Sequence, residues 1–519
     1  MNITQVLHRN LQQGADRVMT VFGDRTTTTR SFVDRVARLA GALQQLGMQP
    51  GDRVAMLALN SDRYMEYFYA VPWGNGVINP CNIRWSVTEN AYALTDSESS
   101  ILIVDDAFKD TALVLKSQVP SLRHILYAGD GATPPGMLRY ESLITNSTPV
   151  TDARRGGDEL LGIFYTGGTT GFPKGVMISH GAFWASQIAI VAEGIVPRHA
   201  TMLRAAPMFH MADLGIGFVG AIQAVTHIIV PSFHPIAVMK AIQQHRVATA
   251  LLVPTMIQML INSPEVGSHD LTSLRSLVYG ASPIQEKVLR DLMALLPDLR
   301  LFQAYGQTEM APLVSILSAE HHEGTSAAAG MLRSCGRAGL CVEVQIVDAD
   351  GNEVPRGTVG EIAVRGPNMM MGYWNKPEQS RSAMPGTGWL LTGDGAYMDE
   401  NGFLFIVDRV KDMIVTGGEN VFSAEVENVL ANHPAVAMCA VIGIPHDEWG
   451  EVVHAFVVPK PDMKPTPEEL IAHCKQAIAN YKCPKSIEFC SSLPLSGAGK
   501  VLKTQLREPF WRDKARQVG

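Results

Sequence analysis

Apolar positions along this chain follow two alternating patterns, short continuous runs and longer stretches with helical spacing. Runs such as Val54–Ala58 and Ser100–Asp105 are expected to form buried strands. In stretches such as Ile236–His245 and Gln285–Leu296, apolar residues recur every three or four positions, which predicts helices. This alternation predicts an α/β fold in which helices cover mostly parallel sheets.

Further strands are expected in the same rhythm at Leu160–Tyr165, His227–Val230, Ala248–Val253 and Leu274–Tyr279. Sheets of this class bind ligands beyond the carboxyl ends of their strands. The loops that follow Tyr165, Tyr279 and Phe302 are therefore the expected ligand-binding region.

The pattern changes from Val342 onward, where short strands alternate with turn signals such as Asp348–Gly351 and Asp399–Gly402. This predicts a β-rich subdomain, a small β-barrel, whose last strand is Phe403–Val407.

Beyond Asp408 the pattern predicts a compact α+β module. A helix is expected at Ser423–Asn432 with Ser423 as its N-cap, and another at Pro467–Asn480. Strands are expected near Val436–Ile442 and His454–Val458. We therefore expect a large N-terminal domain over residues 1–408 and a smaller C-terminal domain over residues 409–519.

Composition narrows the class of protein. The 519 residues are 46% apolar, carry a formal charge of −7 and contain no block of like charges, so neither nucleic acid nor a membrane surface is an expected partner. Met1–Asn10 lacks the apolar core of a signal peptide, and the longest apolar stretch, Leu214–Val225, is shorter than the about 20 residues that span a bilayer. We expect a cytoplasmic protein, with a homodimer left open.

The cysteines and histidines give no sign of a disulfide framework or a zinc site. Seven cysteines, an odd number, are scattered without C-x-x-C spacing, which is typical of reduced thiols. His321 and His322 lie in a polar segment and are predicted to be on the surface.

The densest chemical signal is the segment Tyr165–Lys174, with three glycines, three threonines and one lysine. Glycine lets backbone N–H groups approach phosphate oxygens closely, the hydroxyls donate hydrogen bonds, and lysine adds a point charge. The spacing is not that of a Walker P-loop. The alternative is a surface turn without a ligand.

Together with later blocks, this segment resembles the signature of the adenylate-forming superfamily, which includes acyl-CoA synthetases, adenylation domains of peptide synthetases and luciferases. The blocks follow in that family's order: Tyr305–Glu309, Thr392–Asp394, Asp408–Ile414, Gly417–Asn420 and Leu493–Lys500. The resemblance covers nearly the whole chain and implies a large domain, a hinge and a mobile C-terminal lid.

The resemblance implies a nucleotide site built from several segments. The phosphate-binding residues would be Thr166, Gly167, Gly168, Thr169, Thr170, Gly171 and Lys174. Gly280, Ala281 and Ser282 would flank adenine and Tyr305 would stack on it. Asp394, expected on an exposed turn between glycines, would accept the ribose hydroxyls, and Arg409 would add a contact. Without the resemblance, Asp394 would be interpreted as a turn residue.

The resemblance assigns Glu309 as the Mg²⁺ ligand and Thr308 as a donor to the α-phosphate. Mg²⁺ takes one or two carboxylates and fills its octahedron with phosphate oxygens and water, which agrees with a single glutamate. The alternative for Glu309 is an ordinary acid at a helix N-terminus.

Lys500 matches the family's catalytic lysine, which bridges the substrate carboxylate and the α-phosphate during adenylation. Leu495 and Ser496 depart from the basic and polar pair of the family, which puts a secondary contact in doubt. Lys411 occupies the hinge position, and Gly417 and Gly418 would line the path for coenzyme A. A solvated lysine and a plain turn are the alternatives.

The acyl site is expected along Pro207–Gly220, with His210, Gly215 and Gly306 beside the substrate. Relatives that activate amino acids carry an aspartate near position 210, whereas this segment is apolar, so a fatty or an aryl carboxylic acid is expected. Arg204 and Asp213 are polar exceptions whose direction the sequence leaves open.

These observations predict an acid–CoA ligase that uses ATP, Mg²⁺ and coenzyme A. Two alternatives remain, an adenylating enzyme that loads a carrier protein and a nucleotide-binding module or NTPase without acyl chemistry.

Overall fold

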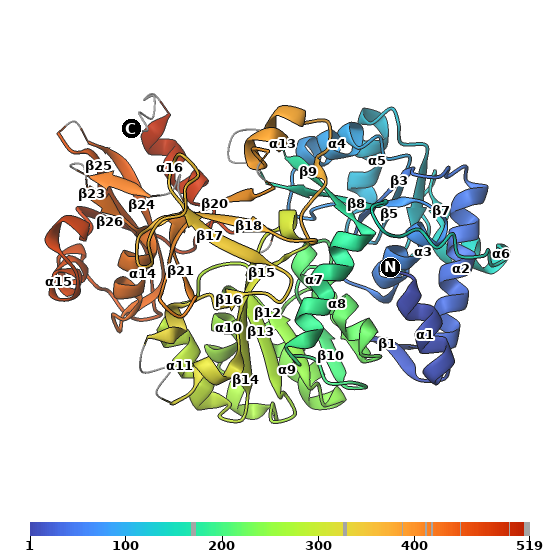
Figure 1. Cartoon of the computed structure of the whole chain (residues 1–519). Coiled ribbons are helices and arrows are strands. Elements are labelled where there is room, and N and C mark those ends of the chain that lie inside the picture. Colours follow the sequence, from blue (N-terminus) through green and yellow to red (C-terminus); the bar gives the residue numbers. More distant parts are fainter. Residues whose placement is uncertain are drawn as a thin grey trace.

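The computed structural model describes residues 1–167, 173–324, 330–386, 388–409, 413–416, 419–446, 448–497 and 499–512, without the side chains of Asp408, Arg409 and Asn420. The chain forms a large N-terminal body with two sheets, a small antiparallel sheet, and a C-terminal α+β domain that packs at one side of the body (Figure 1). The predicted α/β class and the division into a large and a small domain are confirmed.

The first large sheet has the strand order β19-β9-β8-β4-β3-β5-β6-β7. Its strands are β3 (Arg53–Leu57), β4 (Val77–Pro80), β5 (Ile101–Val104), β6 (His124–Tyr127), β7 (Leu138–Arg139), β8 (Leu160–Thr166), β9 (Lys174–Ser179) and β19 (Gly372–Tyr373). Strands β3 to β8 pair in parallel, whereas β9 is antiparallel to both β8 and β19. The helices of this half are α1 (Gln5–Gly14), α2 (Thr29–Gln45), α3 (Asp62–Trp73), α4 (Val87–Asp96), α5 (Lys109–Gln118), α6 (Tyr140–Asn146) and α7 (His180–Ala192).

The second large sheet has the order β16-β15-β14-β13-β12-β10-β11-β1-β2, with parallel pairing from β1 through β14. Its strands are β1 (Val18–Phe22), β2 (Arg25–Thr28), β10 (Thr201–Arg204), β11 (Thr226–Ile229), β12 (Thr249–Leu252), β13 (Ser276–Gly280), β14 (Arg300–Gly306), β15 (Leu313–Leu317) and β16 (Arg337–Ala338). Helices α8 (Met211–Ile222), α9 (Pro235–His245), α10 (Pro254–Ile261) and α11 (Glu286–Leu295) connect them. The strands and helices predicted between residues 227 and 296 are therefore confirmed.

The β-rich region forms a separate antiparallel sheet, ordered β17-β18-β20-β21. Its elements are β17 (Glu343–Val347), β18 (Gly360–Arg365), β20 (Leu390–Met398) and β21 (Leu404–Arg409), with α13 (Pro377–Ala383) between β18 and β20. Among the described residues β17 and β21 do not pair, so the β-rich subdomain is an open sheet and not the closed barrel that was expected.

The C-terminal domain is a mixed sheet covered by three helices. Its elements are β22 (Ile414–Thr416), β23 (Glu419–Val421), β24 (Val436–His446), β25 (Gly450–Pro459), β26 (Ser486–Phe489), α14 (Ser423–Ala431), α15 (Pro467–Ala477) and α16 (Lys503–Trp511). The predicted N-cap is wrong, because Ser423 lies inside α14 and Phe422 precedes the helix. Ser423 is fully buried, and its hydroxyl instead accepts a hydrogen bond from Lys503 Nζ of α16.

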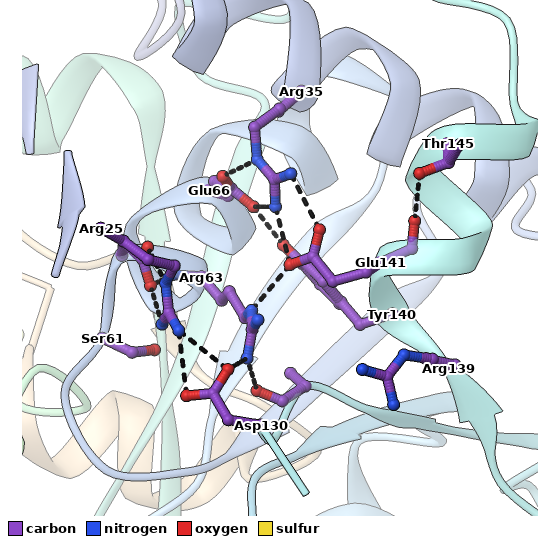
Figure 2. A network of polar contacts seen from close by, with 12 residues as sticks. Arg25, Arg35, Ser61, Arg63, Glu66, Asp130, Arg139, Tyr140, Glu141 and Thr145 are labelled. Atoms are coloured by element: carbon purple, nitrogen blue, oxygen red, sulfur yellow. Dashed lines mark hydrogen bonds and ion pairs between the residues drawn. The ribbon is translucent and has the colours of Figure 1, made fainter. Parts of the chain in front are cut away.

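Helix α3, whose residues are all buried, is anchored by a network of charged side chains (Figure 2). The network consists of Arg25, Arg35, Arg63, Asp62, Glu66, Asp130 and Glu141. Arg35 of α2 donates to Glu66 of α3 and to Glu141 of α6, while Arg63 of α3 donates to Glu141 at 2.8 Å. Removing one partner of a buried pair costs roughly 3–5 kcal/mol, so the network fixes α3 against α2 and α6.

Within the described ranges no helix is long and apolar enough to cross a membrane. All seven cysteines are free, as expected.

Candidate active site

The phosphate end of the site is the hairpin of β8 and β9. Thr166 ends β8 and pairs with Lys174, the first residue of β9, while Gly167 is exposed with open space around its Cα. The tip of the predicted phosphate loop lies outside the described residues: Gly168, Thr169, Thr170 and Gly171. The structure thus shows the two strands that carry the loop and places Lys174 at its base.

Glu309 lies in a 3-10 turn, Thr308–Met310, just after β14. Its Oε1 accepts a hydrogen bond from the Tyr373 hydroxyl at 2.8 Å, and Lys174 Nζ lies over the Tyr373 ring, 5.1 Å from the ring centroid. Burial raises the pKa of Glu309, and the Tyr373 hydrogen bond and the Lys174 charge partly offset that rise. Thr308 is buried beside it.

Tyr373 is a candidate site residue that the sequence did not reveal. It belongs to β19, the two-residue edge strand that pairs with β9 through Tyr373 and Val176. This pairing brings a residue distant in sequence between Lys174 and Glu309. A lone tyrosine after a glycine carries no signal of that placement.

The nucleoside end is formed by Tyr305 of β14 and Asp394 of β20. The Tyr305 hydroxyl donates to Asp394 Oδ2 at 2.7 Å, and the Asp394 amide donates to Thr392 Oγ1 at 3.2 Å. The expected exposed turn is wrong, because Asp394 is half-buried within β20, where Gly393 alone has a positive φ of 76°. Arg409 of β21 pairs with Asp394 in register, which brings the two predicted residues together at the backbone level.

At two of the predicted positions, Gly280 and Gly306, the neighbouring backbone comes so close that only glycine fits. A Cβ on Gly280 would lie 2.0 Å from the Ala304 carbonyl oxygen, and one on Gly306 would lie 1.9 Å from the Pro312 carbonyl oxygen. Ala281, which follows Gly280, has a left-handed φ of 65° that turns the chain into Ser282.

Near this strip the structure corrects the prediction for His322, which is 2% exposed and not on the surface. Its Nε2 lies 2.8 Å from the Tyr279 hydroxyl and its Nδ1 lies 3.1 Å from the Ser318 carbonyl oxygen. Burial lowers the pKa of His322 to about 4.

The acyl end begins at His210, which caps α8 by accepting a hydrogen bond from the Ala212 amide at its Nδ1. Burial and the nearby charge of Lys500 lower the pKa of His210 to about 4, so its imidazole is neutral. Farther along α8, a Cβ on Gly215 would lie 2.9 Å from Gln187 Oε1 and 3.3 Å from Pro312. Gln187 of α7 donates from Nε2 to the Ala311 carbonyl at 2.7 Å, which joins α7 to the segment that follows Glu309.

Lys500 reaches this site from the C-terminal domain. Its amide donates to Ser496 Oγ, which tightens the loop that carries it. Across the domain interface, Arg84 Nη1 donates to the Ser496 carbonyl at 3.0 Å, and the Thr255 hydroxyl donates to the Gly499 carbonyl at 3.3 Å. The sequence showed no basic residue before Lys500, and Arg84 supplies one from the opposite domain.

Three predicted residues of the domain movement lie outside the described residues: Lys411, Gly417 and Gly418. The described residues include no group of three or more His, Cys, Asp or Glu side chains that could hold a metal ion. Any metal at Glu309 would therefore depend on ligands from the substrate, as Mg²⁺ does with phosphates. The second oxygen of Glu309, Oε2, makes no hydrogen bond to a described side chain, which suits that role.

Comparisons with known proteins agree with this arrangement. The family model "AMP-binding enzyme" matches residues 7–374, and the model "AMP-binding enzyme C-terminal domain" matches residues 425–500. The chain is 38% identical over 495 residues to a feruloyl-CoA synthase of Amycolatopsis sp, which covers 94% of this chain and 95% of that protein. It is 34% identical to the medium/long-chain-fatty-acid–CoA ligase FadD8 of Mycobacterium tuberculosis, with coverage of 98% and 90%.

A solved structure of the anthranilate CoA ligase AuaEII in complex with anthranoyl-AMP superimposes with a TM-score of 0.90. It is 25% identical and covers 98% of this chain and 97% of that one. Both family models, the relatives and the fold lead to one conclusion: the chain belongs to the family of AMP-binding enzymes, the adenylate-forming superfamily.

Proposed function

We propose that this protein is an ATP-dependent carboxylic acid–CoA ligase that makes an acyl-CoA through an acyl-adenylate. The observation that carries the proposal is that Lys174, Tyr373 and Glu309 lie together, that Tyr305 holds Asp394, and that Lys500 of the C-terminal domain lies near His210. The names of the relatives, feruloyl-CoA synthase and fatty-acid–CoA ligases, support a carboxylic acid as substrate.

In the first step a carboxylate oxygen of the acid attacks the α-phosphorus of ATP. The bond from that phosphorus to the bridging oxygen breaks, and pyrophosphate leaves with the electron pair. Lys500, beside His210, would neutralise the carboxylate and the α-phosphate as they approach, and Thr308 would donate to the α-phosphate. Lys174 and the loop from Thr166 to Gly171 would hold the outgoing pyrophosphate.

Glu309 would hold Mg²⁺, which when bound supplies positive charge to the phosphates. Tyr373 occupies Oε1 of Glu309, and Oε2 makes no hydrogen bond to a described side chain, which suits a single metal-oxygen contact. We expect Glu309→Gln to lower the adenylation rate sharply and excess Mg²⁺ to restore part of it, as titrations of AMP release against Mg²⁺ would measure. A wild-type Mg²⁺ dependence in the variant would remove Glu309 from this role.

Asp394 would accept the ribose hydroxyls, with Arg409 beside it, and Gly280, Ala281 and Ser282 would flank adenine near Tyr305. In the second step the sulfur of coenzyme A attacks the acyl carbonyl carbon and loses its proton. The bond from that carbon to the phosphate oxygen of AMP breaks, and AMP leaves with the electron pair.

We further propose that the boundary falls between residues 408 and 409, that the C-terminal domain turns about Lys411 between the two steps, and that Gly417 and Gly418 then line the path of coenzyme A. The hydrogen bonds from Arg84 and Thr255 to main-chain carbonyls of the Lys500 loop cross the domain interface and can break when a domain turns, which supports a movable domain. Small-angle scattering that shows one shape with an acyl-adenylate analogue and with coenzyme A added would contradict this movement.

Loading of a carrier protein is a second candidate, supported by 35% identity to a fatty acid–[acyl-carrier-protein] ligase, ScoC, of Streptomyces coeruleorubidus. Acid-dependent release of AMP and pyrophosphate, followed by a thioester on free coenzyme A, is the result expected for a CoA ligase. A thioester formed only on a carrier protein would favour the second candidate. Release of ADP and phosphate without an acid would overturn both in favour of an NTPase. A location in the cytoplasm, where ATP and coenzyme A are available, is part of the proposal.

A further inference from the structure

A small cavity lies between α3 and α8 on the acyl side of the candidate site. Four of its walls are apolar: Met65, Phe68, Leu214 and Phe218. Tyr69 of α3 and Arg204 at the end of β10 add the polar groups, and Gly217 of α8 completes the lining. Its water-accessible space of about 10 Å³ has room for about one water molecule, so the cavity itself can receive a single polar group at the distal end of a ligand.

Arg204 is 2% exposed and forms a buried ion pair with Asp213 of α8. Its Nε lies 3.0 Å from Asp213 Oδ2, and both N–H groups of Nη2 are directed at Asp213, one to the carboxylate and one to the carbonyl oxygen. Nη1 lies 3.5 Å from His227 Nδ1. A guanidinium has five N–H groups, so one N–H on Nη1 has no partner among the described residues.

Gly217 allows the guanidinium to lie flat against α8. A Cβ at this position would come 2.1 Å from Arg204 Nη1, so any other residue would displace the arginine. Arg204 therefore fills the space between β10 and α8, and a substrate that lies along α8 meets it as the end of the pocket.

Tyr69 supplies a second unused donor. It is 4% exposed, and its hydroxyl makes no hydrogen bond to a described residue. The charge of Arg204 acts on the pKa of Tyr69, which agrees with their common place on the cavity wall. The hydroxyl is not among the fully buried polar atoms without a partner, and Tyr69 lines the cavity, so a ligand oxygen there could accept a hydrogen bond from it.

The cavity lies at a defined distance from the reacting end. His210, next to Lys500, and Gly217 are seven residues apart on one helix, and an α-helix rises about 1.5 Å per residue, so the two levels are roughly 10 Å apart. This is the length of a compact aryl acid, whereas a long alkyl chain would have to pass the ion pair.

We propose that Tyr69 and Arg204 determine substrate specificity by closing the acyl pocket with two hydrogen-bond donors. The preferred substrate is then a compact carboxylic acid, an aryl acid in particular, whose distal end carries an acceptor oxygen such as a ring hydroxyl or ether. This inference rests on the proposed acid–CoA ligase function.

The test compares acids of equal shape with and without the distal oxygen, 3-(4-hydroxyphenyl)propanoate and 3-phenylpropanoate, together with hexadecanoate. Acid-dependent AMP release gives kcat/KM for each. The hydroxylated acid is expected to be preferred about tenfold, the usual effect of one neutral hydrogen bond, and hexadecanoate to be the poorest substrate.

Tyr69→Phe removes only the unpartnered hydroxyl, so the fold should persist. The preference for the hydroxylated acid is expected to fall from about tenfold to about twofold. Tyr64→Phe is the matched control, because Tyr64 lies on the same helix, is fully buried, has an unpartnered hydroxyl among the described residues and does not line the cavity. It should leave the preference unchanged.

Removing Arg204 alone would leave the Asp213 carboxylate buried and unpaired, which can unfold the domain. The double variant Arg204→Met with Asp213→Leu removes both charges and should raise kcat/KM for hexadecanoate relative to the aryl acids, while circular dichroism checks the fold.

The outcomes separate the inference from the function on which it rests. A wild type that releases AMP with acids, but with a preference that Tyr69→Phe and Tyr64→Phe change equally or not at all, would overturn the inference and leave the ligase intact. A wild type that prefers hexadecanoate would also overturn it. A wild type that releases no AMP with any acid would overturn the proposed function.

Discussion

The two ends of the candidate site are held in place by different means. At the nucleotide end, two side-chain hydrogen bonds lie within the N-terminal body, one from Tyr373 to Glu309 and one from Tyr305 to Asp394. At the other end, the loop of Lys500 is held by side chains of the N-terminal body that reach backbone carbonyls of the C-terminal domain.

The difference indicates that the nucleotide end is preformed within one domain, whereas the Lys500 loop is brought to the site by the C-terminal domain. Removing a side chain at the nucleotide end disturbs a set of groups that position each other. The Lys500 loop accepts hydrogen bonds from Arg84 and Thr255 across the domain interface. Each such bond has a net worth of about 1 kcal/mol, so a loop held in this way can leave. The nucleotide end should therefore set affinity for ATP, and the docked end should set the rate of the first step.

The largest effect is expected at the docked end. Lys500→Ala removes the charge that meets the α-phosphate, which should slow adenylation on the order of 10²–10³-fold and largely spare thioester formation from a pre-made acyl-adenylate. Separate assays of the two half-reactions measure this, with exposed Lys464→Ala as control. An equal loss of rate in both half-reactions would contradict the role of Lys500 in the adenylation step alone.

An acid-sensitive contribution to stability is expected at the nucleotide end. The pKa of His322 is lowered to about 4, from an ordinary value of 6.5, so the unfolded chain binds a proton that the folded one does not as pH falls from 6.5. At pH 5 this linkage destabilises the fold by about 2 kcal/mol. His322→Gln should reduce the loss of Tm between pH 7 and pH 5, whereas exposed His234→Gln should not. An unchanged pH dependence of Tm would show that His322 already takes up its proton in the fold.

A smaller effect is expected from a variant that tests whether the nucleotide end sets the affinity for MgATP. Tyr373→Phe keeps the ring under Lys174 but removes the hydrogen bond to Glu309, so the Kd for MgATP should rise about tenfold. Calorimetry measures it, and Tyr397→Phe is the control because Tyr397 stacks on Phe405 and makes no hydrogen bond among the described residues. Equal affinities in the wild type and both variants would show that Tyr373 does not position Glu309.

The smallest effect should come from weakening the packing of the Lys500 loop against the N-terminal body. A Cβ on Gly497 would lie 2.6 Å from Asn82 Oδ1 and 3.0 Å from the Phe209 ring, so Gly497→Ala should push the Lys500 loop outward. Adenylation should slow about fivefold, the effect of about 1 kcal/mol of overpacking, with no change in Kd for MgATP. Gly267→Ala, where the new methyl group meets nothing within 4 Å, is the control. If Gly497→Ala changed the Kd for MgATP and left the adenylation rate unchanged, the Lys500 loop would set affinity and not rate.

The sequence predicted the parts of the fold and site that depend on local pattern. The alternation of apolar runs and helical spacing predicted β3, β5 and β11 to β13, because burial on a sheet or a helix imposes a period. Lys174 could be proposed from the glycines and hydroxyls around it, whereas Glu309, Asp394 and Lys500 could be proposed because their blocks resemble those of the adenylate-forming superfamily.

Features that arise from contact between distant segments could not be predicted. Tyr373 reaches Glu309 only because β19 pairs with β9, and the direction of Arg204 depends on the packing of α8 against β10. His322 was expected on the surface because its neighbours are polar, yet the Tyr279 hydroxyl and the Ser318 carbonyl satisfy it in the interior.

The acceptors of the hydrogen bonds across the domain interface have a consequence for how the sequence of this enzyme can change during evolution. The carbonyls of Ser496 and Gly499, and that of Ala437, which accepts from Gln258 at 2.5 Å, belong to the main chain. Every amino acid offers such a carbonyl, so substitutions in the Lys500 loop can accumulate without undoing the contacts, provided that the loop keeps its shape. The Ser496 side chain is different, because its Oγ accepts a hydrogen bond from the Lys500 amide. Mutational scanning should therefore find tolerance at Leu495 and intolerance at Ser496 and Arg84.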